Sequence, residues 1–242
     1  MTLEGLHHVT CVCSNAQRTV DFYRDELRFT LVKKTVNFDD PYSYHLYFGD
    51  EVGSPGTLVT FFEWPRADPG RLGRGTFESI GLVTPSITAE EETDDPDGLR
   101  LRLYPGERPG LHDVVALGSP VLYAGLVAKG APVSFGPAPR ETALIGAGTT
   151  HHVAWRAADD AAQGLWLERL TGLGLRPSSV QDRKYFRSIY FRMPDGILFE
   201  IATDGPGFLV DEPRETLGRG LSLPPWLEDD RPALERELVP IA

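Results

Sequence analysis

The sequence predicts an α+β fold in which paired βαβββ units form an open, cupped, mixed sheet. The first observation is a repeated motif: the segment GLHHVT at 5–10 returns as GTTHHVA at 148–154. The second is that each copy begins the same series of predicted elements, a strand, a helix and three further strands. Because the two copies agree in element order and in spacing, chance is a weak explanation of the repeat.

The composition is that of a soluble globular protein. Hydrophobic residues make up 41% and charged residues 24% of the 242 positions. The net charge of -11 argues against a nucleic-acid or anionic-membrane partner. No apolar run approaches the roughly 20 residues of a membrane span, and we expect a cytoplasmic protein. Cys11 and Cys13 lie two positions apart on a predicted strand, which is poor geometry for a disulfide between them. The sequence leaves open whether the chain forms a homo-oligomer.

Residues 1–66 are predicted to form the first βαβββ unit. Alternating apolar and polar positions around 8–13 indicate a strand, and Asn15 is a suitable N-cap for a helix that continues to Leu27. Three segments rich in β-branched and aromatic residues follow at 29–36, 42–48 and 57–64. Glycine, proline and aspartate between the last two of them indicate turns.

Residues 148–210 are predicted to repeat this unit. We expect a strand at 152–157, a helix at 161–170 that packs through Leu165, Leu167 and Leu170, and strands at 175–180, 185–191 and 197–203. The sequence PDG at 194–196 indicates the last turn. The spacing also repeats, because His8 lies 39 positions before Tyr47 and His152 lies 38 before Tyr190.

Residues 67–147 are less regular, and we interpret them as two shortened or eroded units. Strands are expected at 75–83 and 99–104, with the acidic stretch 90–95 between them in place of a clear helix. The apolar segments 111–117 and 121–144 follow, the second broken by three prolines. Residues 211–242 are predicted to form a C-terminal tail that packs on the body.

The repeated histidines, with one later carboxylate, predict a metal site. His8 and His152 hold equivalent places in the two units, and Glu200 lies on the last predicted strand. Two imidazoles and one carboxylate leave coordination positions open, an arrangement favoured by non-haem Fe(II) oxygenases and suited to Fe(II) or Mn(II). A lone histidine of this kind is more often satisfied by backbone groups. Recurrence with a downstream glutamate reverses that preference.

Thr60 occupies the place in the first unit that Glu200 holds in the last. Each lies four residues after a turn glycine, Gly56 or Gly196. A glyoxalase-type isomerase with four protein ligands would need a carboxylate at Thr60. Glu63 is three residues further on, so strand alternation directs it to the other face. The site is therefore predicted to have three protein ligands.

Four segments carry a resemblance to a known family. They are LVKKTVN at 31–37, YHLYFGD at 44–50, TFFEW at 60–64 and FEIATD at 199–204. With the βαβββ pattern, they resemble the vicinal oxygen chelate superfamily of glyoxalases and extradiol dioxygenases. More narrowly, they are similar to ring-cleaving dioxygenases that act on hydroquinones, of the 2,6-dichlorohydroquinone 1,2-dioxygenase type. The resemblance is dense over 5–64 and 148–227 and thin between them. Members normally carry four complete units, whereas the second and third are short here.

The resemblance implies roles for eight residues. It assigns the metal ligands to His8, His152 and Glu200, in agreement with the repeat. It adds five residues around the metal: His7, Thr10, His151, Arg183 and Tyr190. Tyr190 would donate a hydrogen bond to a substrate oxygen, and Arg183 or His151 would stabilise negative charge.

Four of these five roles have structural alternatives. Strand alternation places His7 and His151 on the face opposite the ligands. Tyr190 is equally consistent with a core aromatic whose hydroxyl is satisfied, and Arg183 beside Asp182 with a surface ion pair.

The resulting expectation is a non-haem Fe(II)-dependent ring-cleaving dioxygenase that joins O2 to a hydroquinone or a catechol-like aromatic. Mn(II) is the alternative metal. One rival is a glyoxalase-type isomerase or thiol transferase. Another is a small-molecule-binding protein that sequesters a drug or metabolite in the cup and needs no metal.

Overall fold

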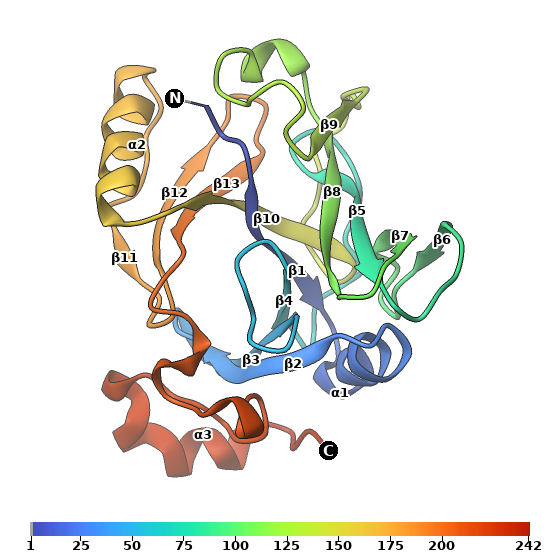
Figure 1. The fold of residues 1–242 in the computed structure, drawn as a ribbon, viewed down its shortest axis with the longest axis vertical. Coiled ribbons are helices and arrows are strands. Elements are labelled where there is room, and N and C mark those ends of the chain that lie inside the picture. Colours follow the sequence, from blue (N-terminus) through green and yellow to red (C-terminus); the bar gives the residue numbers. More distant parts are fainter. Residues whose placement is uncertain (1) are drawn as a thin grey trace.

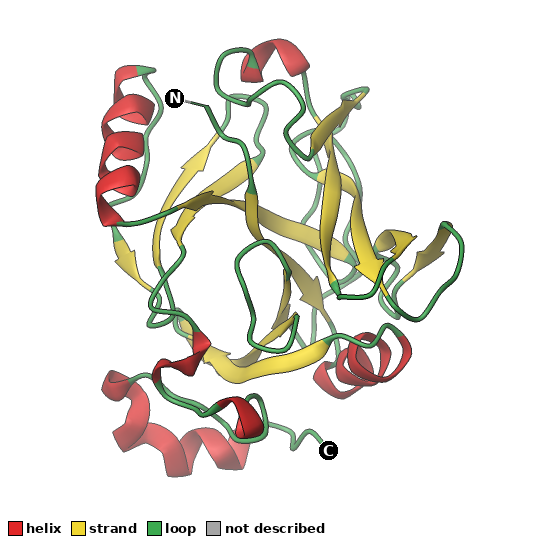
Figure 2. Cartoon of the chain, in the orientation of Figure 1, coloured by secondary structure: helices red, strands yellow, loops and turns green. Residues whose placement is uncertain are grey.

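The computed structural model describes residues 2–242, which form two sheets, one of eight strands and one of five (Figures 1 and 2). The large sheet has the order β11-β12-β13-β10-β1-β4-β3-β2. Its first half comes from the start of the chain: β1 (Leu6–Cys13), α1 (Ala16–Val20), β2 (Thr30–Asn37), β3 (Asp40–Gly49) and β4 (Leu58–Glu63). The second half comes from a later segment: β10 (Thr149–Ala157), α2 (Asp160–Gly172), β11 (Gln181–Asp182), β12 (Arg187–Arg192) and β13 (Leu198–Thr203).

The two halves of the large sheet share one pairing pattern and meet at their first strands. In each half the first strand runs parallel to the last, β1 beside β4 and β10 beside β13. β1 and β10 then pair antiparallel and join the halves. The sheet curls around the space between them (Figure 1). The predicted α+β fold with a cupped mixed sheet is confirmed.

Local capping explains where both main helices begin. The Asn15 side chain accepts a hydrogen bond from the Arg18 amide at the start of α1, and Asp159 caps α2 in the same way. After α1 the chain continues as a π-helical turn, Asp21–Glu26, where a longer α-helix was expected. α2 is buried through Gln163, Trp166 and Leu170. The expected packing through Leu165 is wrong, because that side chain is exposed.

The strand expected at 175–180 is also absent. The segment is irregular and leads into the two-residue strand β11. Pro177 has no N–H to donate to a ladder. Ser178 contacts β12 through both backbone and side chain, because its amide donates to the Tyr190 carbonyl and its hydroxyl accepts from the Tyr190 amide. Ser178 thus makes two hydrogen bonds to β12 by itself, and a regular strand is not formed.

The middle of the chain forms the second sheet, in the order β6-β7-β5-β8-β9. Its strands are β5 (Phe77–Thr84), β6 (Glu91–Asp94), β7 (Arg100–Pro105), β8 (Gly110–Leu117) and β9 (Val133–Gly136). β5 is parallel to β7, β8 is parallel to β9, and β5 and β8 pair antiparallel. As in the large sheet, two parallel strand pairs are joined by one antiparallel pair, but the second sheet has fewer strands. The acidic stretch contains a strand, β6, that was not expected. The division of the chain into four units stays a prediction.

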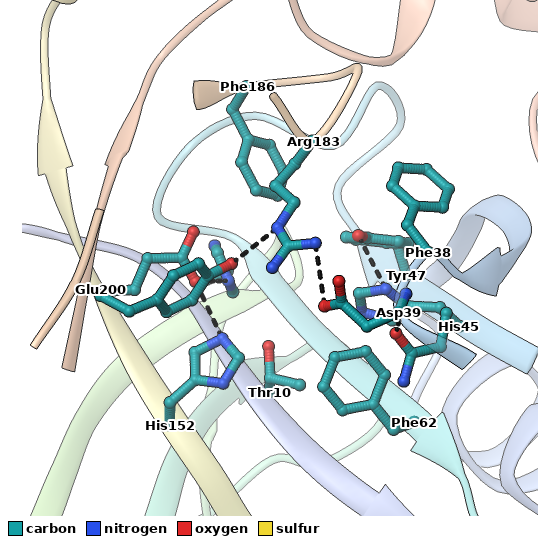
Figure 3. Close-up of a pocket in the computed structure, with 13 residues that line it drawn as sticks. Thr10, Phe38, Asp39, His45, Tyr47, Phe62, His152, Arg183, Phe186 and Glu200 are labelled. Atoms are coloured by element: carbon teal, nitrogen blue, oxygen red, sulfur yellow. Dashed lines mark hydrogen bonds and ion pairs between the residues drawn. The ribbon is translucent and has the colours of Figure 1, made fainter. Parts of the chain in front are cut away.

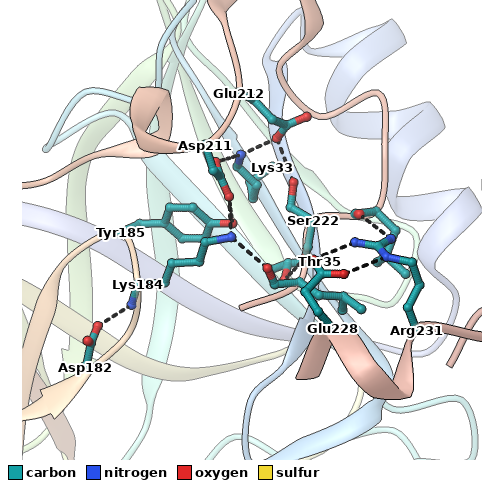
Figure 4. Close-up of polar contacts among 12 residues, drawn as sticks. Lys33, Thr35, Asp182, Lys184, Tyr185, Asp211, Glu212, Ser222, Glu228 and Arg231 are labelled. Atoms are coloured by element: carbon teal, nitrogen blue, oxygen red, sulfur yellow. Dashed lines mark hydrogen bonds and ion pairs between the residues drawn. The ribbon is translucent and has the colours of Figure 1, made fainter. Parts of the chain in front are cut away.

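Residues after β13 cross the outside of β2 and β3. They contain short 3-10 helices at Phe208–Val210, Arg214–Thr216 and Pro225–Asp230, and α3 (Arg231–Glu237). A further 3-10 helix, Pro120–Tyr123, precedes β9. Lys33 on β2 is fully buried and forms ion pairs with Asp211, at 2.7 Å, and with Glu212 (Figure 4). Lys184 also pairs with Asp211, so this charge cluster joins the C-terminal segment to both halves of the cup.

Within the described residues, no helix is both long enough and apolar enough to cross a membrane.

Candidate metal centre

Three potential metal ligands converge in the middle of the cup. His8 lies on β1, His152 on the adjacent β10 and Glu200 on β13, next to β10. All three side chains are buried, and their ligand atoms lie within 4.8 Å of one another. Glu200 Oε2 is 3.3 Å from His8 Nε2 and 2.9 Å from His152 Nε2. The sequence predicted this convergence from residues that are far apart along the chain.

The Glu200 carboxylate shows that the residues present fit a metal ion. One oxygen, Oε1, accepts a hydrogen bond from the Ser188 hydroxyl. The other, Oε2, faces the two imidazoles, is buried and accepts no hydrogen bond of acceptable geometry among residues 2–242. Burial disfavours the carboxylate anion, but the neighbouring His8 and His152 hold the pKa of Glu200 well below its usual range. An anionic oxygen aimed at two imidazole nitrogens is the donor set of a divalent metal.

Two β-bulges bring His7 and His151 to the same side as the ligands, which corrects the expectation that they face away. In the β1–β10 ladder, Leu6 pairs with Trp155 and His8 with Ala154, so His7 is an extra residue. Thr10 pairs with His152 and Cys11 with Thr150, so His151 is extra on the other strand. Each bulge sets two consecutive residues against one, and strand alternation fails there.

The bulged histidines contact the ligands directly. His7 Nδ1 lies 2.9 Å from His8 Nδ1, and His151 Nδ1 lies 2.7 Å from His152 Nδ1. Burial lowers the pKa of His7 and of His151 to about 3, so both rings are neutral at pH 7. At each contact one of the two Nδ1 atoms donates a hydrogen and the other accepts it. When the ligand ring holds that hydrogen, its Nε2 lone pair is free for a metal.

Arg183 and Tyr190 stand on the wall of the same cavity. Arg183 Nε donates to the Tyr190 hydroxyl at 3.1 Å, and Arg183 forms a 3.0 Å ion pair with Asp39 (Figure 3). Tyr190 also lies across from Glu200 in the β12–β13 ladder. Tyr190 lines the cavity and its hydroxyl is satisfied by Arg183, so its role toward a substrate stays a prediction. Arg183 is mostly buried and its partner is Asp39, so the surface pair with Asp182 is wrong.

Thr60 has the position that the repeat predicted. It pairs with Thr10 in the β1–β4 ladder, as Glu200 pairs with Ala154 in the β10–β13 ladder. Glu63 is directed to the other face of the sheet, where its carboxylate accepts a hydrogen bond from the Ala16 amide at 2.9 Å. The metal-ligating group found within residues 2–242 therefore has three members and takes no carboxylate from the first half.

Sequence reasoning missed several residues that line the cavity. His45 and Tyr47 on β3 face it, Phe62 and Phe186 contribute aromatic rings, and Asn37, Phe38 and Asp39 lie at its edge (Figure 3). Strand alternation places 45 and 47 on one face of the predicted strand 42–48, and this signal could have found them. Ser188, behind Glu200, could have been found in the same way, since it shares a strand face with Tyr190.

A model of the Glyoxalase/Bleomycin resistance protein/Dioxygenase superfamily matches residues 5–201. The chain belongs to this superfamily. The match includes both histidine motifs and Glu200, so the family assignment and the geometry of the centre rest on the same segments.

Within the superfamily, similar proteins include several named for ring cleavage. The chain is 36% identical to "Putative ring-cleaving dioxygenase MhqO" of Bacillus subtilis (strain 168), over 98% of this chain and 96% of that protein. It is 29% identical to "Chlorohydroquinone/hydroquinone 1,2-dioxygenase" of Sphingobium indicum, over 98% and 96%. The first alignment spans 299 positions, so the relative contains residues that this 242-residue chain lacks.

Solved structures give the same picture. A crystal structure of a "putative dioxygenase" from Bacillus subtilis superposes with a TM-score of 0.91 at 33% identity, over 100% of this chain and 98% of that one. Glyoxalase I from Zea mays superposes with a TM-score of 0.57 at 13% identity, over 83% and 92%. The second likeness shows a shared fold.

Proposed function

We propose that the protein is a non-haem Fe(II)-dependent ring-cleaving dioxygenase, of the extradiol type, that acts on a hydroquinone or catechol-like aromatic. The observation that carries this proposal is the buried group of His8, His152 and Glu200, which opens onto a cavity with aromatic walls. The names of the similar proteins support the same reaction.

The three ligands would hold Fe(II), with Mn(II) as the alternative. A metal bound by two imidazoles and one carboxylate keeps open positions and would supply the redox chemistry that joins an aromatic diol to O2. His7 and His151 would keep the ligand rings in the orientation and tautomer that binding requires. Ser188 would hold the far oxygen of Glu200 so that the near oxygen faces the metal.

The cavity walls would orient the substrate and stabilise its charge. Phe186 and Phe62 lie on opposite sides of the cavity in Figure 3 and would confine an aromatic ring between them. Arg183 would stabilise the negative oxygen of a phenolate. Tyr190 accepts from Arg183 Nε, which leaves its own hydroxyl hydrogen free to donate to a substrate oxygen.

The two rivals fit this site less well. An isomerase of the four-ligand kind would need a carboxylate where Thr60 stands, and Glu63 is engaged with the Ala16 amide on the other face. A metal-independent binding protein would have no use for a buried carboxylate oxygen that lacks a hydrogen bond. Both observations favour the dioxygenase.

Oxygen uptake tests the proposal. The protein would be loaded with Fe(II) or Mn(II) without air and then exposed to O2 with a panel of hydroquinones and catechols. We expect one O2 consumed for each aromatic ring lost, measured with an oxygen electrode and by aromatic absorbance. Turnover of an aromatic substrate without oxygen uptake would falsify the proposal. A glyoxalase substrate, methylglyoxal with glutathione, serves as the control for the isomerase.

A further inference from the structure

A chain of hydrogen bonds runs along the cavity wall from Tyr47 on β3 to Thr10 on β1. The Tyr47 hydroxyl lies 3.0 Å from His45 Nδ1, and His45 Nε2 lies 3.0 Å from Thr60 Oγ1. Thr60 Oγ1 then donates to Thr10 Oγ1 at 2.9 Å. Tyr47, Thr60 and Thr10 form a row across the adjacent strands β3, β4 and β1, and Thr10 pairs with His152 on β10.

The bond between the two threonines fixes the direction of the whole chain. Thr60 has one hydroxyl hydrogen and gives it to Thr10, so it must accept from His45 Nε2–H. His45 is neutral, because burial lowers its pKa well below the usual value. Its other nitrogen, Nδ1, therefore has no hydrogen and accepts from the Tyr47 hydroxyl.

The end of this chain is a free donor beside the metal ligands. Thr10 is fully buried, lines the cavity and accepts from Thr60. Among residues 2–242 its hydroxyl donates to no protein group, so its hydrogen is available to a ligand. In Figure 3 the Thr10 oxygen is directed toward the space next to His152 and Glu200.

We propose that His45 is a positioning residue that, through Thr60, fixes the Thr10 hydroxyl as a hydrogen-bond donor to a phenolate oxygen at the metal centre. The inference rests on the proposed function, because it assigns the ligand to the phenol class. It also gives Thr60 a role beyond leaving a coordination position open. Without His45, the Thr60 hydroxyl can rotate and accept from Thr10, which withdraws the donor from the cavity.

The ionisation of a bound phenol measures this donor directly. The probe is 4-nitrophenol, which is yellow only as its anion, bound to Fe(II)-loaded protein under argon. His45→Leu removes the donor to Thr60, whereas His45→Gln keeps an amide N–H that can replace it. We expect the pH at which half of the bound probe is ionised to rise by about one unit in His45→Leu, as loss of one charged hydrogen bond implies. His45→Gln should stay near wild type.

A second pair of variants tests the next link without changing an aromatic ring. Thr60→Val should cause the same rise as His45→Leu, and Thr60→Ser, which keeps the hydroxyl, should not. In a Thr10→Val background, His45→Leu should produce no further rise, because the residue it acts through is gone. Circular dichroism and metal content would show that each variant is folded and loaded.

The outcomes separate this inference from the proposed function. Three outcomes would overturn the inference. The pH of half-ionisation could rise equally in His45→Leu and His45→Gln, or His45→Leu could still raise it in the Thr10→Val background. The third is that the wild-type protein does not bind the probe as an anion. In each of these cases, oxygen uptake with diols would still support the dioxygenase, because that measurement does not depend on the probe. Conversely, the variants could show the predicted shifts in probe ionisation while no diol gives oxygen uptake. That result would contradict the dioxygenase proposal and support the hydrogen-bond chain that binds a phenolate.

Discussion

Glu200 and Thr60 occupy matching positions in the two halves of the cup. In the proposed metal centre, the presence of a carboxylate at one position and a hydroxyl at the other sets the number of protein ligands. Glu200 completes the centre from β13, whereas Thr60 on β4 carries a hydroxyl that bonds to Thr10 and His45. The open side of the centre therefore faces the first half of the sheet. Two substitutions at these positions test the arrangement.

Glu200→Gln should abolish metal-dependent activity while the protein still folds. The amide has the size of the carboxylate but lacks its charge, so we expect metal affinity to fall by at least about 100-fold. Ser188→Ala is the matched control: it removes only the hydrogen bond to Oε1 and should cost about 10-fold to 100-fold. Metal titration and oxygen uptake measure both. Full oxygen-uptake activity in Glu200→Gln, or full ligand binding after treatment with a chelator, would contradict the proposed metal centre and favour a metal-independent binding protein.

Thr60→Glu should suppress oxygen uptake without loss of the metal. The new carboxylate would stand where Glu200 stands in the other half and would fill an open coordination position. Thr60→Ala should keep metal binding, because a three-ligand centre does not need this side chain. Metal content and oxygen uptake are the measurements. Metal loss in Thr60→Ala would show that Thr60 is itself needed to hold the ion.

The sequence predicted the convergence of the three proposed ligands better than the arrangement of the residues behind them. His8, His152 and Glu200 follow from the repeat, because equivalent positions in paired units converge. His7 and His151 were assigned to the wrong face, because a bulge leaves no mark in a hydrophobic pattern. The role of His45 was also beyond sequence reasoning. It depends on hydrogen bonds across three strands.

At the scale of elements, a buried carboxyl joins the second sheet to the first helical segment. Asp95 follows β6 and is only 6% exposed. Its Oδ1 accepts from the amides of Asp97 and Leu99, both at 2.9 Å, and the Tyr23 hydroxyl donates to Oδ2 at 3.3 Å. Burial raises the pKa of Asp95 from 3.8 to about 6, despite these hydrogen bonds.

Asp95 should make the protein less stable as the pH rises from about 4 to about 6. The folded state keeps the Asp95 proton to a higher pH than the unfolded state does. The contribution of protonated Asp95 to the free energy of unfolding is therefore full below pH 3.8 and lost above about pH 6. A difference of about two pKa units corresponds to roughly 3 kcal/mol. Asp95→Asn cannot ionise and should lack this fall. Urea unfolding of both proteins between pH 4 and 7 measures the difference, and parallel curves would contradict the assignment.

Elements with strong local signals were predicted, and those set by tertiary contacts were not. The helix caps Asn15 and Asp159 act within a few residues, and of these two the first was identified from sequence. The strand expected at 175–180 failed because Ser178 satisfies β12 by itself. β6 was missed because its acidic residues suit an exposed edge strand, which burial patterns do not reveal.

At the scale of the whole molecule, the C-terminal segment braces the loop that carries Arg183. Lys184 pairs with Asp211, and its ammonium also donates to the Leu223 carbonyl at 2.8 Å. Trp226 packs edge to face against Phe38 at the cavity rim. The segment thus contacts Phe38, which lines the cavity, and Lys184, which follows the lining residue Arg183. Its packing was predicted only as a tail on the body.

Lys33→Met should destabilise the protein and loosen this segment. Loss of the buried ammonium removes the ion-pair partner that Glu212 has among residues 2–242 and leaves Asp211 paired with Lys184 alone. Both carboxylates retain some contact with solvent. We therefore expect the free energy of unfolding to fall by roughly 2 kcal/mol, which is below the usual cost of breaking a fully buried ion pair. Lys34→Met, at the next position, is the control and should change stability by less than about 0.5 kcal/mol. Urea unfolding and limited proteolysis after residue 205 would measure both, and equal effects would show that the ion pairs are unimportant.

The two bulges make this centre tolerant of a kind of change that normally disrupts a strand. Removing one residue from a strand usually reverses the facing of every side chain beyond it. Here, deletion of His7 would close the ladder into regular pairing, with Leu6 still opposite Trp155 and His8 still opposite Ala154. The deletion should fold and keep the metal ligands, yet lose the second imidazole behind His8. A length change in the gene would then alter the chemistry of the metal and leave the scaffold intact, and thermal melting with metal titration of the shortened chain would show it.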